Sequence, residues 1–333
     1  MIRTANPSIL AEWARLARWR EWVQSKLPFM AAVTVLLAPP STPTVRVAAI
    51  VATVMAGAAF GYGLNEVADR ASDARAGKDN RAAGLAPWRW ALFLVVTAAG
   101  ALGLSLVWAP DGVAPALVVL GLSLAVLYSV RPFRLKERGA AALVGAAAAQ
   151  WAVPVLVVSA AEPAGWLRPA AWSFALLGLA IGVRWIVVHQ LQDASRDRLA
   201  GVSTYTADGG DVTVALVGAF AWELVLLGAG LALTWPGSAL ALIAVGIWLL
   251  HTSLLVFSRG SLVARLASYE DAPLAGYYFF GLPAAVAVGR LITVPASAGM
   301  AALLIALALP ALLARLMRWR QARPVGPSHA QRA

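Results

Sequence analysis

The chain has 333 residues, of which 60% are apolar and only 13% charged, and its formal net charge is +11. This composition excludes an ordinary soluble domain and indicates a polytopic membrane protein. The absence of cysteine excludes disulfides, thiolate catalysis and cysteine-ligated metal.

The first 26 residues mix Glu12, Glu21 and several arginines with tryptophans, so they lack the apolar core of a cleavable signal peptide. They predict a cytoplasmic interfacial helix, and an irregular solvated tail is the alternative. The apolar residues expected to face lipid are Ile9, Leu10, Trp13, Leu16 and Trp22, and those expected to face phosphate headgroups are Arg15, Arg18 and Arg20.

Apolar segments of about 20 residues, enough to cross a bilayer as a helix, recur along the chain. The alternation of a transmembrane barrel is absent, so the prediction is all-α: a transmembrane bundle of nine or ten helices in one domain over 27–319. A disordered basic tail is expected over 320–333. The predicted helices are 27–39, 45–66, 88–108, 113–130, 139–160, 169–190, 211–234, 237–257, 273–292 and 297–317.

The positive charges lie almost entirely on one side of this predicted topology. Of the 27 lysines and arginines, only Arg46, Arg168 and Arg290 fall on the other side, with Arg184 inside a helix. Cytoplasmic loops collect lysine and arginine, so both termini are expected in the cytoplasm, and the membrane is expected to be the cell membrane. Because this topology explains the charge, no nucleic-acid partner is expected, and no obligate protein partner is evident.

Carboxylates are scarce, and several gather in a run after the second apolar segment. Asn65, Asp69 and Asp73 recur every four residues, which places an amide and two carboxylates on one helical stripe, and Glu66 stands beside them. Mg²⁺ prefers oxygen ligands and commonly takes one or two carboxylates together with substrate phosphate oxygens. The run therefore predicts a magnesium and phosphate site, and a solvated helix end with local arginine pairs is the alternative.

A second run repeats this geometry after the sixth segment, with Asp193 and Asp197. The aspartates of both runs fall within long predicted connections on the positive face, 67–87 and 191–210, which suggests a functional face. Two metal ions could bracket a diphosphate between the runs. Diphosphate-binding residues are expected in both runs and in the basic turn that follows the fourth segment. They are Lys78, Arg81, Tyr128, Arg134, Lys136 and Arg198.

Three further polar residues lie within or near apolar segments. Arg184 and Glu223 are ionisable groups inside predicted helices, where such groups are costly and usually face a cavity or each other. We expect Arg184 to line the polar end of a cavity, with Glu223 as its partner or as an acceptor contact; a purely structural ion pair is the alternative. His189 is either a helix-end histidine or a catalytic base.

On these motifs the chain resembles the UbiA-type superfamily of intramembrane prenyltransferases. That family carries Asn-Asp-x-x-Asp-x-x-x-Asp after its second helix, Tyr-Ser-x-x-Pro-x-Arg-x-Lys after the fourth, and Asp-x-x-x-Asp followed by Arg, Ala-Gly-Val and Thr after the sixth. The matching residues are Asn65, Asp69, Asp73, Lys78, Asn80, Arg81, Tyr128, Ser129, Pro132, Arg134, Lys136, Asp193, Asp197, Arg198, Ala200, Gly201, Val202 and Thr204.

The chain departs from the family pattern in two places. Glu66 stands where the family usually has aspartate, which puts its role as a metal ligand in doubt. An extra helix near 273–292, preceded by Tyr269-Glu270-Asp271, puts the usual nine-helix count in doubt.

The resemblance implies a helical bundle around a central cavity, with Mg²⁺ held by the aspartates, a diphosphate donor and an apolar tunnel open to lipid. The implied function is Mg²⁺-dependent transfer of a prenyl group to an aromatic or quinone-precursor acceptor. A terpene cyclase or a polyprenyl-phosphate group transferase could use the same diphosphate site. A cation-binding transporter is a further alternative from a different class, and it would need polar residues through the whole membrane thickness.

Overall fold

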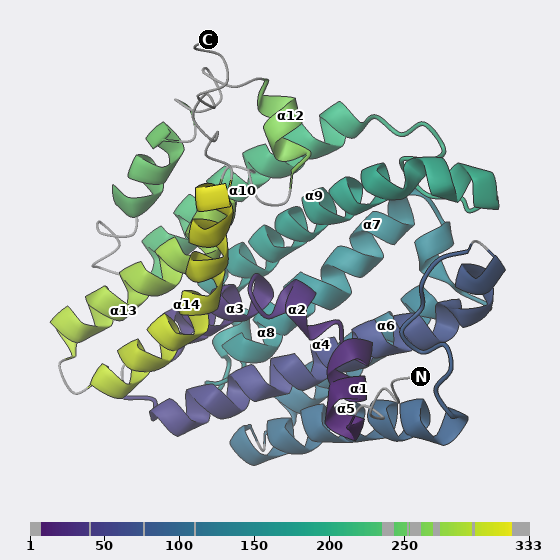
Figure 1. Ribbon diagram of the computed structural model, residues 1–333. Coiled ribbons are helices and arrows are strands. Elements are labelled where there is room, and N and C mark those ends of the chain that lie inside the picture. The colour runs from purple at the N-terminus through teal and green to yellow at the C-terminus, as the bar shows by residue number, and fades with distance from the viewer. Residues whose placement is uncertain are drawn as a thin grey trace, which may run out of the picture.

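The computed structural model is a bundle of helices (Figure 1). It describes residues 8–39, 41–75, 77–109, 111–234, 243–251, 253, 261–268, 274–294 and 297–321. No strand occurs within these ranges, which confirms the all-α prediction.

Six helical stretches are long and apolar enough to cross a membrane. They are Thr44–Arg75 (α4), Pro87–Trp108 (α5), Ala140–Ser159 (α7 to α8), Pro169–Arg198 within α9 (Pro169–Ala200), Val212–Thr234 (α10) and Ala298–Met317 within α14 (Ala298–Gln321). Three apolar helices are shorter: Lys26–Leu37 (α3), Val113–Ser129 (α6) and Tyr277–Thr293, which combines η4 (Tyr277–Gly281) with α13 (Leu282–Thr293).

Each predicted apolar segment corresponds to a helix over most of the residues that the structure describes, and only end residues such as 38–39 and 130 are not helical. For the segment 237–257 this covers 243–251 and 253; the remainder lies outside the described residues, as do Tyr269-Glu270-Asp271 and the tail from 322 onward. The extra helix expected near 273–292 is present as η4 and α13.

The acidic runs lie within helices, which corrects the predicted connections. Helix α4 continues to Arg75 and α9 to Ala200, so the segments 67–75 and 191–200 are helical. Hydropathy alone ended both helices too early, because the turns that continue them are polar; in α9 the Asp193–Arg196 pair at i, i+3 supports such a turn. Helix α9 ends where Gly201 adopts φ 64° and donates its N–H to the carbonyls of Asp197 and Arg198.

The segment predicted as one helix over 139–160 contains a π turn. It consists of α7 (Ala140–Ala147), η2 (Ala148–Ala152) and α8 (Val153–Ser159). Pro154 near the start of α8 has no N–H to donate to the carbonyl of Gln150, and a widened turn accommodates that loss. Both Gln150 and Trp151 in this turn line the central cavity.

Helix α9 packs closely against α7 and the π turn, because glycines on α9 leave room for them. A Cβ atom on Gly182 would lie 2.7 Å from the Cβ of Ala147, and one on Gly178 would lie 3.2 Å from the carbonyl carbon of Trp151. Fully buried side chains surround this contact: Phe29, Trp151, Phe174, Leu177 and Ile181.

The N-terminal segment is helical but packs against the protein more than was predicted. Helix α1 (Ile9–Leu16) leaves Leu10 71% exposed, whereas Leu16 is 0% exposed and Trp22 of α2 (Trp19–Trp22) 4%. Trp13 packs edge-on against Phe93, with ring centroids 5.7 Å apart. The lipid-facing role predicted for Leu16 and Trp22 is therefore wrong, since neighbouring helices bury these side chains, whereas Trp13 is only half-buried.

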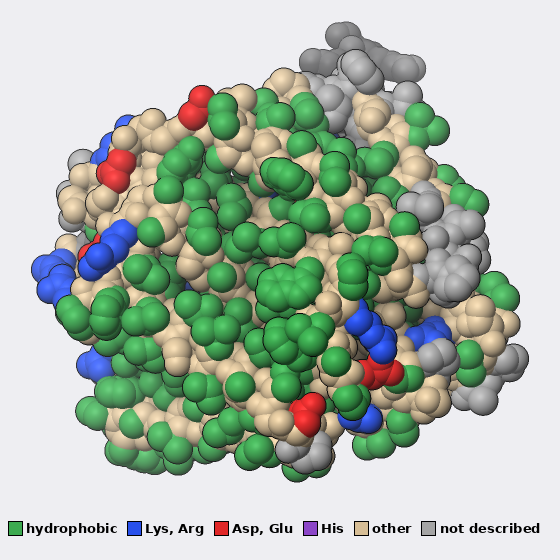
Figure 2. Space-filling model, turned by 180° about the vertical axis from the view of Figure 1, so that it is seen from behind, with side chains coloured by type: hydrophobic (Ala, Val, Ile, Leu, Met, Phe, Trp, Pro, Cys, Tyr) green, Lys and Arg blue, Asp and Glu red, His purple; other side chains and the backbone are tan. Residues whose placement is uncertain are grey.

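The outer surface is suited to lipid. In Figure 2 apolar side chains are spread over the whole visible face, and the charged groups lie mainly along its left edge and in a cluster at its lower right. Large apolar side chains are exposed on several of the spanning helices, including Val95, Val107, Val214, Trp222 and Ile305. In water such a surface would be unstable, so the chain is an integral membrane protein.

Candidate active site

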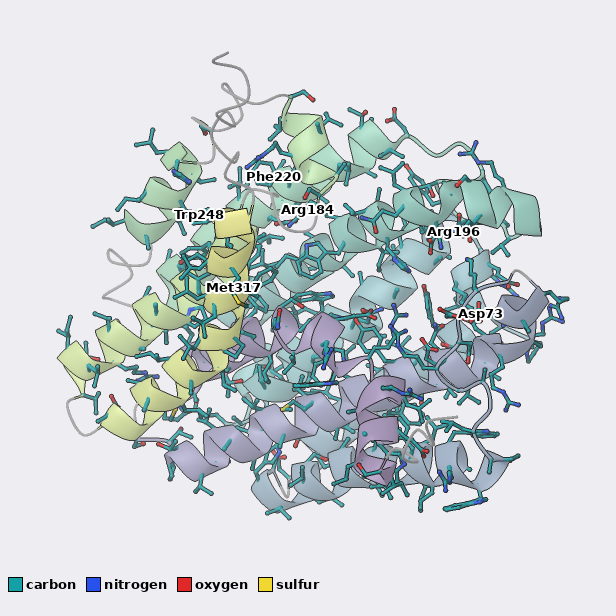
Figure 3. The ribbon with its side chains drawn as sticks, in the orientation of Figure 1. Asp73, Arg184, Arg196, Phe220, Trp248 and Met317 are labelled. Carbon is teal, nitrogen blue, oxygen red and sulfur yellow. The ribbon has the colours of Figure 1, made fainter. Side chains whose placement is uncertain are left out.

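A single large cavity connects the two acidic runs. Its volume is about 1590 Å³, and it extends from the acidic motifs to aromatic side chains inside the bundle. The predicted site residues that line it are Asn65, Asp69, Asp73, Lys78, Tyr128, Arg134, Lys136, His189, Asp193 and Asp197. Figure 3 places Asp73 of α4 and Arg196 of α9 at the same end of the bundle.

The last turns of α4 supply the first acidic stripe. Asn65, Asp69 and Asp73 all face the cavity, as their spacing predicts. Asn80, in the connection that follows α4, donates from its amide to Asp73 Oδ2 at 2.7 Å and to the carbonyl of Glu66 at 2.8 Å. This connection therefore fixes the carboxylate of Asp73 at the cavity rim.

The basic turn after α6 contacts the same stripe. Lys136 donates to Asn65 Oδ1 at 2.9 Å and forms an ion pair with Asp69. Arg134 donates to Asp69 Oδ1 at 3.1 Å and also forms an ion pair with Glu137. Burial is the largest influence on the pKa of Lys136 and lowers it, although the Asp69 carboxylate acts in the opposite direction.

The end of α9 supplies the second acidic pair from across the cavity. Asp197 is buried and accepts a hydrogen bond from Lys78 at 3.2 Å, which links the two motifs. Asp193 pairs with Arg196 at 2.9 Å, and the His189 Nε2 lies 3.8 Å from the Asp193 carboxylate. Two acidic helix ends with their own cations thus border one space.

Glu66 points away from this space. Its carboxylate accepts from the backbone N–H of Arg81 at 2.8 Å and from the Arg81 guanidinium at 3.0 Å, and Arg18 lies 3.7 Å away. Neither Glu66 nor Arg81 lines the cavity. One residue past Asn65 on a helix is a rotation of about 100°, which explains why Glu66 lies off the stripe.

Three other predicted residues also lie outside the cavity lining. Arg198 donates to the carbonyl of Ala194 at 3.2 Å, whereas Arg196 lines the cavity. Arg184 and Glu223 are both 0% exposed and form a two-bond pair at 2.6 and 3.1 Å, joined by the Tyr278 hydroxyl at 3.1 Å from Glu223. The expectation that Arg184 lines the cavity is wrong, and its pairing with Glu223 is confirmed.

Sequence reasoning missed the polar residues that the N-terminal segment and the π turn bring to the cavity. Lys26, Tyr62 and Gln150 line it together. No local sequence signal relates Lys26 to residues 36 and 124 positions away.

The carboxylate and amide oxygens at the cavity mouth suit a hard divalent cation that is also coordinated by a bound substrate. Among the described residues, no three acidic or histidine side chains form a ready-made metal cage. The aspartates instead form one stripe on α4 and one pair on α9, an arrangement that suits Mg²⁺ completing its coordination with phosphate oxygens and water.

The fold and site together define a helical membrane protein with an acidic, cation-flanked cavity. A family model, the UbiA prenyltransferase family, matches residues 27–275. The chain belongs to this family.

Solved structures of similar fold agree. A UbiA homolog from Archaeoglobus fulgidus bound to DMAPP and Mg²⁺ superposes with a TM-score of 0.58 at 14% identity, covering 90% of this chain and 98% of that one. The homolog from the same organism bound to GPP and Mg²⁺ gives 0.57 at 15% identity, covering 90% and 99%. No curated protein sequence matches the chain.

Proposed function

We propose that this protein uses Mg²⁺ to transfer a prenyl group from an isoprenoid diphosphate to an acceptor inside the membrane. The observation that carries the proposal is the shared cavity, which is bordered at one end by two acidic helix ends and continues inward to aromatic walls. The structures of similar fold that hold DMAPP or GPP with Mg²⁺ support the donor class.

The polar end of the cavity would hold the diphosphate. Asp69, Asp73, Asp193 and Asp197 would be the metal ligands, with Asn65 as a neutral oxygen donor. Mg²⁺ bound there would act as a Lewis acid that neutralises the diphosphate as it leaves. The cations that already contact these carboxylates lie within reach of a diphosphate between the helix ends; they are Lys78, Arg134, Lys136 and Arg196.

The inner end of the cavity would hold the prenyl chain. Trp151, Trp185 and Phe279 line it and form edge-to-face contacts, with centroids 5.4 Å apart for the two tryptophans and 5.3 Å for Trp185 and Phe279. Carbon–oxygen cleavage leaves an allylic cation, which the negative faces of aromatic rings stabilise. Apolar walls also exclude water, so the acceptor rather than water captures the cation.

Two other enzymatic outcomes would use the same donor site: closure of the isoprenoid on itself, and transfer of a group onto a polyprenyl phosphate. We favour prenyl transfer because the cavity holds a polar cluster inward of the aspartates, where a second substrate would lie. The cation-transporter alternative is disfavoured, because the charged residues within the described helices do not form a path: Arg184 and Glu223 bond to each other outside the cavity lining.

Both termini and the aspartate motifs are proposed to face the cytoplasm of a cell membrane, since the positive charge gathers at that face. Diphosphate would then leave into the cytoplasm.

Mass spectrometry of the reaction products tests the proposed function. Purified protein is incubated with isoprenoid diphosphates of several lengths and Mg²⁺, with and without a panel of aromatic acceptors. Adducts that form only with an acceptor support prenyl transfer. An acceptor-independent hydrocarbon would establish a cyclase instead, and a lack of metal-dependent donor consumption would reject the diphosphate site.

A further inference from the structure

The N-terminal segment before α3 forms part of the cavity wall. Four of its side chains line the same space as the aspartates: Arg18, Arg20, Glu21 and Trp22. Two contacts dock the segment on the bundle. The Glu12 carboxylate accepts hydrogen bonds from Arg89 of α5 at 2.8 and 2.9 Å, and the ring of Trp22 stacks on that of Tyr62, with centroids 6.4 Å apart. The family model begins at residue 27, so this wall lies outside the part of the chain that the family model matches.

A closed ring of four charged side chains holds Arg18 at this wall. Its Nη2 atom lies 2.6 Å from Glu21 Oε2, and Glu21 Oε1 accepts a hydrogen bond from Arg81 at 2.8 Å. Arg81 also donates to Glu66 Oε1 at 3.0 Å, and that oxygen lies 3.7 Å from Arg18 Nη1. Because the charges alternate around the ring, each side chain restrains its neighbours.

The guanidinium of Arg18 keeps hydrogen-bond donors that no described residue accepts. It carries five N–H groups. The 3.7 Å from Nη1 to Glu66 is too long for a hydrogen bond, and Nε is buried without a partner among the described residues. A buried donor without an acceptor is costly, so the arrangement favours a ligand with several acceptor oxygens beside Arg18. A phosphoryl group matches the fork of a guanidinium in this way.

The backbone of Arg18 supports a role for its side chain. Arg18 has φ 49°, in the left-handed region that favours glycine. Arg134, which already contacts Asp69, has φ 38°. In the described ranges four residues other than glycine have positive φ, and two of them are these arginines, which both line the cavity. Strained backbone of this kind is concentrated at ligand-binding sites.

Arg18 lies about one helical turn inward of Asp69. Its neighbour Glu66 is three residues before Asp69 on α4, which is about 4.5 Å along the helix axis. The guanidinium carbon of Arg18 also lies 5.8 Å from the ring centroid of Tyr62, one further turn inward. A diphosphate between the acidic helix ends would have its prenyl-bearing phosphoryl group on the inner side, because the prenyl chain would lie in the apolar end of the cavity. Arg18 therefore borders the position of that phosphoryl group.

We propose that Arg18 binds the prenyl-bearing phosphoryl group of the donor, so that the N-terminal segment is part of the diphosphate site. This rests on the proposed function. When the carbon–oxygen bond breaks, its electron pair stays on the oxygen of that phosphoryl group, and the N–H groups of Arg18 stabilise the negative charge that develops there. Glu21 is a positioning residue, because it acts through Arg18.

The test measures the affinity of purified protein in Mg²⁺ for geranyl S-thiolodiphosphate, an analogue of the donor that cleaves slowly. Arg18→Met should weaken binding at least tenfold. Arg18→Lys keeps the charge but not the fork, so its affinity should lie between those of Arg18→Met and wild type. Arg18→Gly suits the left-handed backbone and serves as the second variant if Arg18→Met does not fold.

Arg15→Met is the matched control. Arg15 belongs to the same segment, is exposed and does not line the cavity, so its variant loses the same charge without losing the proposed contact. It should bind the analogue within twofold of the wild-type affinity.

Glu21→Gln separates contact with the ligand from docking of the segment. The variant loses the ion pairs of Glu21 with Arg18 and Arg81, keeps the guanidinium of Arg18 and removes a negative charge from the cavity wall. It should therefore bind the analogue at least as tightly as wild type. If the ring served only to dock the segment, Glu21→Gln would lose as much affinity as Arg18→Met.

Two results would overturn the inference: wild-type affinity in Arg18→Met, or an equal loss of affinity in Arg18→Met and Glu21→Gln. Failure of the proposed function looks different, because it is seen in wild-type protein, which would then not bind the analogue in Mg²⁺. In that case inorganic diphosphate with Mg²⁺ is the probe, and the same comparison of variants measures the contact of Arg18.

Discussion

At the scale of single residues, neighbouring side chains on one helix have different roles. Asp69 and Glu66 are separated by less than one turn of α4, yet Asp69 faces the cavity and Glu66 is held by Arg81 on another side. The i, i+4 spacing was sufficient to predict the cavity-facing stripe. It could not predict the partner of Glu66, because Arg81 reaches it only through the fold of the connection after α4.

Neutralising the proposed metal ligands should abolish turnover. Asp69→Asn and Asp193→Asn keep the size of the side chain but remove its charge, and we expect each to lower kcat by about 100-fold or more, a loss of ~3 kcal/mol of transition-state stabilisation. Rates are measured at saturating donor across a Mg²⁺ series.

Asp79→Asn is the matched control. Asp79 is exposed, lies in the connection after α4 and does not line the cavity, so its variant should turn over at the wild-type rate. Near-normal turnover in Asp69→Asn would reject the metal-ligand assignment.

Glu66→Gln should affect stability rather than the metal. The variant weakens charge-assisted bonds to Arg81, a loss of about 1–2 kcal/mol after allowing for the partial exposure of the guanidinium. Thermal unfolding in detergent should show a lower Tm, while the Mg²⁺ concentration for half-maximal rate stays at its wild-type value. A large rise in that concentration would place Glu66 among the metal ligands after all.

At the scale of elements, hydropathy predicted where the helices lie but not how they end or deform. The apolar segments correspond to helices, whereas the polar extensions of α4 and α9 and the π turn of η2 were not foreseen. The extensions carry the aspartates, and the π turn carries Gln150 and Trp151 to the cavity. A hydropathy window averages over such local features, although Pro154 is a signal that could have indicated the turn.

The contact between α9 and the π turn should tolerate no added bulk. Gly182→Val places side-chain atoms where Ala147 and Trp151 already lie, and we expect a destabilisation of about 1–3 kcal/mol together with reduced activity. Gly228→Ala in α10 is the control, because no atom lies within 4 Å of its Cβ position, and its Tm should equal or exceed that of wild type. Equal Tm values for both variants would contradict the close approach.

At the scale of the whole molecule, a buried polar network joins three parts of the bundle. Glu223 of α10 accepts hydrogen bonds from Arg184 of α9 and from the Tyr278 hydroxyl of η4, and both charged groups are fully buried. The sequence indicated that Arg184 and Glu223 could pair, since a charged group inside a membrane is costly unless an opposite charge lies beside it. It could not show that the pair lies outside the cavity, because that depends on the rotation of α9 against α10.

Breaking this pair should therefore destabilise the bundle. Glu223→Gln leaves the Arg184 charge buried without a carboxylate, which costs about 3–5 kcal/mol when one partner of a buried pair is removed. The double variant Arg184→Met/Glu223→Gln should recover much of the lost Tm. If Glu223→Gln instead keeps its Tm and only raises the KM for an acceptor, the pair belongs to the substrate site.

The most direct test of the account is calorimetric titration of geranyl S-thiolodiphosphate into wild-type protein, with Mg²⁺ and then with EDTA in its place. We predict Mg²⁺-dependent binding at one site, lost in Asp69→Asn and in Asp193→Asn and retained in Asp79→Asn. Binding that does not require Mg²⁺ would contradict a diphosphate site built from the ends of α4 and α9. So would an affinity in Asp69→Asn and Asp193→Asn that equals the wild-type affinity.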